Sequence, residues 1–359
     1  GKNAITEFPV LQDVQCAFRP GEITLVLAPP GHGKTALLKA LAGCLPAGSL
    51  PESAVTYGGL TASELKQKGV SVNRLCAYVE QVDTHLPFLT VRETAAFSHD
   101  NSCPPPPDTE EGASVHRDKL RAVTDLLALE GCIDTIIGDD LVRGVSGGEK
   151  KRVTIAETLV TNARVLCMDE ISTGLDAAVT FNIIAALRAW ARSTEGTAVV
   201  ALLQPTPEVF DQFDHLLLLR EGAPVYHGPR KDAAAYFGKL GFAAPAPNSG
   251  EDVADWLVNL VASPAKALAR TGSTADLSSL EKSTGTPLTT KALKTAWRES
   301  GELFEKSTKT SAAPDGRDVE LATDFAKAQY GINFPHSAYT QFLWVLKRQF
   351  QITIRNKLF

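Results

Sequence analysis

The sequence predicts an α/β fold built on a mostly parallel sheet, and three observations support this prediction. A β-branched run over 23–27 leads directly into a glycine-rich loop and then into a helical pattern. Apolar runs alternate with helical patterns further along the chain, which is typical of parallel strands with helices on both faces of the sheet. One such run, Val165 to Met168, ends in the acidic pair Asp169 and Glu170. Open α/β sheets bind their ligands at the carboxyl ends of such strands.

Size and composition fit one large domain with extensions. The chain has 359 residues, of which 44% are hydrophobic and 21% are charged, so it can bury a full-sized core. The net charge of −5 argues against a nucleic-acid partner, because binding to a phosphate polymer needs a concentrated basic face. Six scattered cysteines without a CxxC pair indicate reduced thiols rather than disulfides or a metal site. The chain begins at Gly1 and holds no apolar run of about 18 residues, so we expect a fragment of a longer protein.

The first predicted elements are two strands around a turn. Residues 10–18 and 23–27 read as the strands and 19–22 as the turn. The second strand enters the loop from Ala28 to Thr35, and the helical pattern that follows ends at Gly43. We expect an antiparallel β subdomain beside the main sheet.

Helical patterns dominate the middle of the chain. They begin near Thr90 and predict an inserted helical subdomain over about 90–162. After it the chain returns to strands separated by helices. The predicted elements of this part are helices over 117–129, 147–160 and about 177–190, and strands over 165–168, 197–203 and 216–219.

The composition changes after about residue 262, where Ser, Thr, Lys, Ala and Gly become common. We therefore place one domain over 1–262 and a linker over 263–335. Within the linker, only about 289–306 has a helical pattern.

The last segment, 336–359, predicts a basic amphipathic helix. Its apolar residues recur every four positions, at Phe342, Leu346, Phe350, Ile354 and Leu358, with lysines and arginines between them. It is too charged to span a bilayer but suits an anionic membrane surface, which 341–359 would contact. The alternative is a helix that docks on its own domain through the same apolar stripe, and the sequence leaves both open.

The glycine-rich loop predicts a phosphate-binding site. Its backbone N–H groups can point into one concavity, and the helix that follows adds its positive N-terminal end. Lys34 would reach the β- and γ-phosphates, and the Thr35 hydroxyl would hold Mg²⁺. Ala28 stands where the usual pattern has glycine, which alters neither the charge nor the later donors. The residues assigned to nucleotide binding here are Gly31, His32, Gly33, Lys34, Thr35 and Ala36.

The acidic pair after the 165–168 strand would complete this site. Asp169 suits a contact to Mg²⁺, and Glu170 suits a group that polarises the attacking water. Two acids at a strand end could also cap the next helix. The turn Gly174-Leu175-Asp176 shortly afterwards favours the catalytic interpretation.

Ser146-Gly147-Gly148-Glu149 forms a capping box. As a cap alone, two glycines at the start of a helix are a poor choice, because both lower helix propensity. They make sense where a γ-phosphate must approach the backbone closely. The start of this helix would then form one half of an ATP site. A second copy of the domain would supply the other half, the phosphate loop.

These motifs, in this order, resemble the ABC transporter superfamily. LVRGVSGGEKKRVTIAETLV, MDEISTGLD, THLPFLTVRET and FDHLLLLREGAPVYHGP are similar to its subfamily G. ALLQPTPEVFDQFDHLLLL and the closing QFLWVLKRQFQITIRNKLF resemble the first nucleotide-binding domain of the full-size pleiotropic-drug-resistance type. The resemblance covers about 10–260 and 336–359. It implies a P-loop NTPase fold of the ABC type, with the helical subdomain carrying the Ser-Gly-Gly signature.

The resemblance also implies roles for single residues. Gln81 would be the glutamine that links the Mg²⁺ site to the transmembrane domain, and Asp176 the D-loop aspartate. Ser146, Gly147 and Gly148 would contact ATP across a dimer of nucleotide-binding domains. The sequence departs from the pattern at Leu203, where half-size relatives have the switch histidine, and this puts hydrolysis at the Lys34 site in question. Phe8 is the nearest candidate for stacking on adenine, although strand packing is its more common role.

The favoured hypothesis is the ATP-binding and ATP-hydrolysing domain of a full-size subfamily G exporter, with ATP and Mg²⁺ as ligands. Its partners would be a transmembrane domain and a second nucleotide-binding domain. We expect this domain to lie on the cytosolic side of the plasma membrane. One alternative is a regulatory module of the same transporter that binds ATP with little hydrolysis. Others are a half-size subfamily G transporter and a soluble ABC ATPase.

Overall fold

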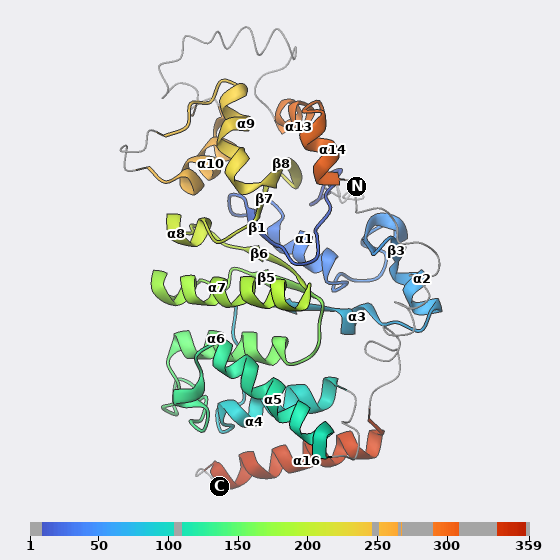
Figure 1. Ribbon diagram of the computed structural model, residues 1–359, viewed down its shortest axis with the longest axis vertical. Coiled ribbons are helices and arrows are strands. Elements are labelled where there is room, and N and C mark those ends of the chain that lie inside the picture. The colour runs from blue at the N-terminus through green and yellow to red at the C-terminus, as the bar shows by residue number, and fades with distance from the viewer. Residues whose placement is uncertain are drawn as a thin grey trace, which may run out of the picture.

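The computed structural model describes residues 9–103, 110–245, 251–264, 267, 290–308 and 336–356, without the side chains of 110–116 and Ala338. Phe8, Leu358 and residues 309–335 of the predicted linker lie outside the described residues. Figure 1 shows a central sheet with helices around it and the helix α16 (Ala338–Arg355) at one end of the molecule.

A six-stranded sheet in the order β4-β5-β6-β1-β7-β8 forms the centre of the fold. Its neighbouring strands are parallel except for the antiparallel pair β7–β8. This confirms the mostly parallel sheet with added antiparallel strands. The strands are β1 (Ile23–Leu27), β4 (Cys76–Val79), β5 (Val165–Asp169), β6 (Thr197–Ala201), β7 (His215–Arg220) and β8 (Ala223–Pro229).

Both faces of the sheet are covered, because its strands are apolar on both sides. Val26 and Cys167 face one core cluster together with Leu37 and Leu38 of α1 (Lys34–Leu41). Alternate strand residues face a larger cluster with Ile183 and its neighbours in α7 (Ala177–Thr194). Each strand is therefore held between two packed layers, and this fixes the positions of the loops at the strand ends.

Three helices form a separate group at the α16 end of the molecule (Figure 1). They are α4 (Val91–Ser102), α5 (Glu110–Leu126) and α6 (Gly147–Leu159), and they pack on one another. α4 and α6 begin with complete capping boxes at Thr90 and Ser146, so their start positions are fixed by side-chain hydrogen bonds. α6 also packs against β4, which ties the group to the sheet.

The remaining short elements lie along the sheet edges and loops. A small antiparallel hairpin of β2 (Thr56–Tyr57) and β3 (Leu60–Thr61) precedes β4. The others are α2 (Ala62–Gln67), α3 (Val72–Leu75), α8 (Pro207–Phe210), α9 (Ala233–Lys239), α10 (Val253–Ala262) and the 3₁₀ turns Glu52–Ala54, Glu130–Cys132 and Arg230–Asp232.

The strand predicted over 10–18 does not form. Within the described part of the chain, the backbone N–H groups of residues 10–18 make two isolated backbone hydrogen bonds, from Gln12 to the Gly222 carbonyl and from Ala17 to the Ser307 carbonyl. The partners of this segment are the β7–β8 turn and the helix α14, neither of which offers a strand ladder. The prediction of a hairpin with β1 was therefore wrong.

Two helices occupy the region where one was predicted over about 289–306. They are α13 (Thr290–Arg298) and α14 (Glu302–Thr308), separated at Gly301, whose φ of 63° ends a helical path. Both pack on β8, and Trp297 of α13 is fully buried there. This part of the predicted linker is thus docked on the domain.

The helix α16 lies on α4 through its polar face. Arg348, Gln351 and Arg355 contact α4 or the residues just before it. The apolar stripe points away: Phe350 is 65% exposed and Ile354 66%. The alternative that α16 docks on its own domain through this stripe was therefore wrong. None of the helices in the described part of the chain is long and apolar enough to cross a membrane.

Candidate functional site

The glycine-rich loop joins the carboxyl end of β1 to α1. Gly31 and Gly33 have φ of 78° and 94°, a left-handed conformation that favours glycine. A Cβ added to Gly31 would meet no atom of the described chain within 4 Å, so Gly31 is set by its backbone conformation and not by crowding. Lys34 starts the helix, while Thr35 is exposed at its first turn. The local geometry therefore presents backbone N–H groups and a helix N-terminus to one space.

The Lys34 side chain is held inside the site. It is 5% exposed, its Nζ donates to the Ala28 carbonyl at 3.0 Å, and it lies 3.6 Å from Glu170 Oε1. A buried ammonium needs such partners because isolated charges are costly away from water. The structure thus brings together Lys34 and Glu170, which are distant in the sequence.

Asp169 lies at the end of β5 and has one free acceptor. Its Oδ2 accepts a hydrogen bond of 3.0 Å from the Tyr78 hydroxyl, while the buried Oδ1 has no hydrogen-bond partner among the described residues. An unpartnered buried carboxylate oxygen is unusual. A carboxylate oxygen is a ligand that Mg²⁺ prefers, so Asp169 Oδ1 fits a Mg²⁺ ligand. Burial and the neighbouring Asp169 carboxylate raise the pKa of Tyr78, which keeps its hydroxyl a donor.

Gln81 reaches the same place from the loop after β4. Its Nε2 donates to Thr173 Oγ1 at 3.3 Å, and that hydroxyl donates to the Glu170 carbonyl at 3.0 Å. Glu170 has a φ of 49°, a left-handed conformation that is uncommon outside glycine and occurs often at functional sites. Side chains from β4 and β5 therefore meet beside the lysine that follows β1.

The strand order explains this convergence. β6 lies between β5 and β1, and the Glu170 N–H donates to the Ala201 carbonyl at the end of β6. Leu203 follows directly and is 37% exposed, with Gln204 exposed beside it. The position of Leu203 is therefore between the acidic pair and the glycine loop, where the switch residue was predicted. Its side chain offers neither a hydrogen-bond donor nor a charge.

The loop is also joined to the β7–β8 turn. The His32 carbonyl accepts from the Gly222 N–H at 3.2 Å, and His32 Nδ1 accepts from the Glu221 N–H at 3.2 Å. Burial lowers the pKa of His32, partly offset by the Glu221 carboxylate, so the ring is a neutral acceptor at pH 7. His32 thus anchors the loop through its side chain.

The Ser-Gly-Gly group lies at another place. Ser146 Oγ and the Glu149 carboxylate form the reciprocal capping bonds of α6. A Cβ on Gly148 would touch Val179 at 3.3 Å, whereas one on Gly147 would meet nothing within 4 Å. Packing near α7 therefore explains Gly148 in part, while nothing among the described neighbours requires glycine at 147.

Asp176 caps α7, and its Oδ1 accepts from the Val179 N–H at 2.7 Å. Because Gly148 lies close to Val179, α6 and α7 begin side by side, with Ser146, Gly147 and Asp176 exposed. None of the hydrogen bonds seen for Ser146 in the described part of the chain reaches the glycine loop. The hydrogen bonds of Ser146 therefore do not join the Ser-Gly-Gly group to the glycine loop.

Sequence reasoning missed three supports of the site: Tyr78, Thr173 and the turn Glu221-Gly222. Tyr78 comes three positions before Gln81 on the adjoining strand, which is a usable signal for a side chain at the strand end. Thr173 follows the acidic pair, but nothing in the pattern indicates its bond to Gln81. The turn is far away in the sequence and only the sheet order brings it to the loop.

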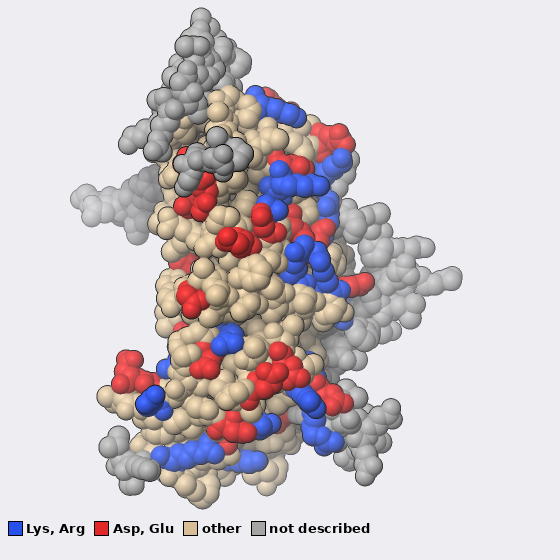
Figure 2. Space-filling view, turned by 60° about the vertical axis from the view of Figure 1, so that its left-hand side comes forward, with Lys and Arg blue, Asp and Glu red and all other residues tan. Residues whose placement is uncertain are grey.

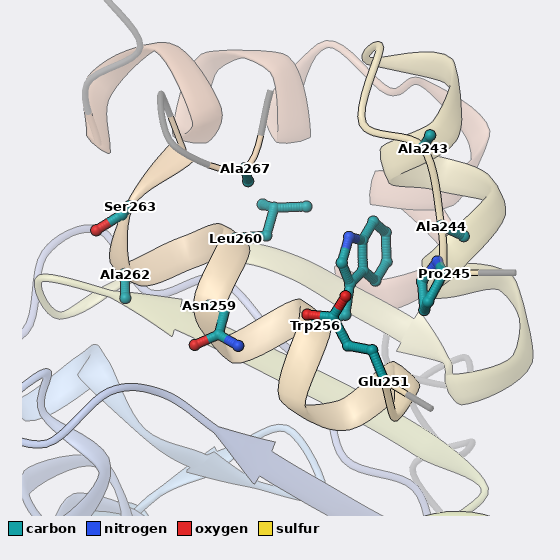
Figure 3. Close-up of a pocket in the computed structure, with 10 residues that line it drawn as sticks. All are labelled: Ala243, Ala244, Pro245, Glu251, Trp256, Asn259, Leu260, Ala262, Ser263 and Ala267. Atoms are coloured by element: carbon teal, nitrogen blue, oxygen red, sulfur yellow. The ribbon is translucent and has the colours of Figure 1, made fainter. Parts of the chain in front are cut away.

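A different pocket, of about 580 Å³, lies beside α10 (Figure 3). Its described lining is mostly apolar, with Trp256 and Leu260 inside and Glu251 as its one charged residue. A triphosphate needs cationic and N–H donors, which this lining does not concentrate. The glycine-loop site is the better nucleotide site.

The comparisons with known proteins agree with the geometry. Residues 11–173 match the family model described as ABC transporter. The fold is similar to that of CbiO1 from Clostridium perfringens, part of the ABC transporter complex CbiONQ, with a TM-score of 0.51, 22% identity, and coverage of 63% of this chain and 84% of that one. This part of the chain is therefore an ABC transporter domain, whose family typically binds and hydrolyses ATP.

Its curated relatives place the domain within that superfamily. ABC transporter G family member 53 from Oryza sativa subsp. japonica is 40% identical over an alignment of 282 residues that covers 71% of this chain and 19% of the relative. Pleiotropic drug resistance protein 1 from Petunia hybrida is 40% identical over an alignment of 276 residues that covers 69% of this chain and 18% of the relative. The chain thus corresponds to the nucleotide-binding region of G-family and pleiotropic-drug-resistance proteins and spans about a fifth of their length.

Proposed function

We propose that this domain binds and hydrolyses ATP with Mg²⁺ to drive a full-size G-family exporter. The observation that carries the proposal is that Lys34, Glu170 and Asp169 lie together at the carboxyl ends of β1 and β5. Asp169 Oδ1 has no hydrogen-bond partner there among the described residues. The relatives' names support the transporter class. The domain boundaries at about 262 and 335 belong to the same proposal.

In this proposal each residue has one task. The backbone N–H groups from Gly31 to Ala36 hold the phosphates, and Lys34 turns from the Ala28 carbonyl toward the β- and γ-phosphates. Thr35, Gln81 and Asp169 would hold Mg²⁺, which would offset the phosphate charge. Glu170 would orient the attacking water once Lys34 contacts the phosphates instead of its carboxylate.

The second half of each site comes from a partner domain. Ser146 and Gly147 are exposed at the start of α6, and a γ-phosphate could approach Gly147 without a clash, because a Cβ there would meet nothing within 4 Å. Asp176 lies next to them and would meet the partner's site. This supports ATP-dependent pairing with a second nucleotide-binding domain of the same polypeptide, transmitted to a transmembrane domain as a rigid-body change.

The helix α16 supports a membrane-side position for this end of the molecule. Its exposed stripe includes Phe342, Leu346, Phe350 and Ile354, with Lys347 exposed among them. Figure 2 shows basic side chains along the end of the molecule that α16 occupies in Figure 1, with acidic ones just above. An exposed apolar face that carries an exposed lysine suits an anionic bilayer surface. We place the domain on the cytosolic side of the plasma membrane.

The experiment is ATP turnover by the natural full-length protein carrying Glu170→Gln or Lys34→Ala. We expect Lys34→Ala to weaken ATP binding, and Glu170→Gln to keep binding while removing the hydrolysis that depends on Lys34. Glu195→Gln is a matched control, because Glu195 also has a positive φ of 54° and lies at the far end of α7. An unchanged rate in Glu170→Gln would show that this site does not hydrolyse.

Leu203 favours a second candidate function, a regulatory site that binds ATP with little turnover. Replacement of the switch histidine by leucine removes a donor to the γ-phosphate. Leu203→His decides the matter. A hydrolytic site weakened by leucine gains turnover that still requires Glu170, whereas a regulatory site shows no Glu170-dependent turnover in either form.

A further inference from the structure

A buried lysine in α6 holds the segment that carries Gln81. Lys151 is 2% exposed, and its Nζ lies 2.8 Å from the Gln81 carbonyl oxygen and 2.8 Å from Asp83 Oδ1. A lysine pays a large desolvation penalty when it is buried, so it is tolerated only with well-placed partners. Both partners of Lys151 come from the loop after β4.

Asp83 is itself fixed on α6 by further contacts. The Thr154 hydroxyl donates to Asp83 Oδ1 at 2.6 Å, and His85 Nε2 lies 2.9 Å from that hydroxyl. His85 Nδ1 lies 3.2 Å from Glu157 Oε2, one turn further along α6. The segment 81–85 therefore follows the surface of α6 through several polar contacts, of which Lys151 is the most buried member.

We propose that Lys151 is a positioning residue for Gln81. Lys151 locks the loop after β4 to α6, the helix that begins at the Ser-Gly-Gly group. This rests on the proposed function, in which Gln81 serves the nucleotide of its own glycine loop and the start of α6 serves a partner's nucleotide. A rigid Lys151 link makes the two half-sites of one chain move together. Lys151 acts through the Gln81 backbone and touches no reacting atom.

The weakness of the other restraints on Gln81 supports this role. Its described side-chain bond, to Thr173, is long at 3.3 Å, and the residue is exposed. Without Lys151 the Gln81 carbonyl would lose its cationic partner, and the side chain would be positioned by that long bond. A displacement of about 1 Å near reacting groups can cost about 100-fold in rate. Substrate affinity, set mainly by the glycine loop, would change little.

The test uses Lys151→Met in the natural full-length protein, with Lys119→Met as its matched control. Lys119 also donates to a backbone carbonyl, that of Val160 at 2.8 Å, but at the opposite end of α6. The first readout, made without nucleotide, is hydrogen exchange of the amides over 80–86. The second is kcat and KM for the part of ATP hydrolysis that Lys34→Ala abolishes.

We expect Lys151→Met to speed exchange over 80–86 and to lower kcat at least about tenfold with KM within about twofold. Combining it with Gln81→Ala should add no further loss, because both act on one group. Lys119→Met should leave both readouts near wild type after correction for folded protein. Where Lys151→Met folds poorly, Asp83→Asn with Lys151→Met removes the unpaired charge, and its kcat should stay low while its stability recovers.

Three results would overturn the proposal: unchanged exchange over 80–86, equal loss of kcat in the Lys119 control, or multiplying losses with Gln81→Ala. If Lys34→Ala and Gln81→Ala leave turnover unchanged, the proposed function fails instead. In that case faster exchange in Lys151→Met still shows the link to α6, and its role in hydrolysis falls with the function.

Discussion

Replacing Arg355 by methionine should release α16 from the helical group. Arg355 Nη1 and Nη2 lie 2.5 and 2.8 Å from the two oxygens of Glu93, and Nη1 also donates to the Phe88 carbonyl at 3.0 Å. Shielded charge-assisted hydrogen bonds contribute about 1.5–3 kcal/mol, whereas exposed ion pairs contribute about 0.2–1 kcal/mol. The two side chains are 37% and 23% exposed, so we estimate about 1–2 kcal/mol, or about 5–30-fold in the docked population.

The assay is hydrogen exchange over 338–356 in the natural protein, because an isolated helix of this length is marginal in water and exchanges once undocked. Gln349→Ala on the exposed side of α16 is the control. Hydrogen bonding to Arg355 lowers the pKa of Glu93 from its usual 4.5, so this contribution is present above that pH and is lost as the pH falls through the lower folded-state value. A rise below about twofold in Arg355→Met, or an equal rise in the control, would refute the reasoning.

Three further outcomes are expected. Gly144→Ala should destabilise the protein by about 1–3 kcal/mol in chemical denaturation, because its Cβ would lie 2.2 Å from the Ile137 carbonyl oxygen; alanine at Gly131, where a Cβ meets nothing within 4 Å, should be neutral. Burial lowers the pKa of His227 to about 3, so wild type should lose about 1.4 kcal/mol per pH unit relative to His227→Gln as the pH falls from about 6.5 toward that value; parallel curves would contradict this. Tyr78→Phe should raise the Mg²⁺ concentration needed for half-maximal hydrolysis, because Asp169 loses the donor that orients it; an unchanged Mg²⁺ titration would count against that role.

Much of the sheet and several local features around the candidate site could be predicted, because they depend on local patterns. The β-branched run before the glycine loop is β1, and the acidic pair does end a buried strand next to β6. The capping box at Ser146 forms as its spacing indicates. Each of these depends on residues a few positions apart, where the sequence carries the physical information.

The rest depends on contacts between distant segments. Residues 10–18 fail to form a strand because their neighbours are a turn and a helix. The apolar stripe of α16 faces outward because charged residues on its other side find Glu93, 262 residues earlier in the chain. A lysine at 151 reads as a surface residue until its partner Gln81, 70 residues earlier, is placed beside it. Periodicity identifies a helix face but not its partner.

Vanadate trapping of labelled ATP on the natural full-length protein tests the central claim most directly. After trapping, the label is mapped to the peptide that holds residues 28–36. We predict vanadate-dependent label on this peptide, abolished by Glu170→Gln and kept in Glu195→Gln. Label that persists in Glu170→Gln, or ATP binding at this loop without any trapping, would contradict hydrolysis by Lys34, Asp169 and Glu170.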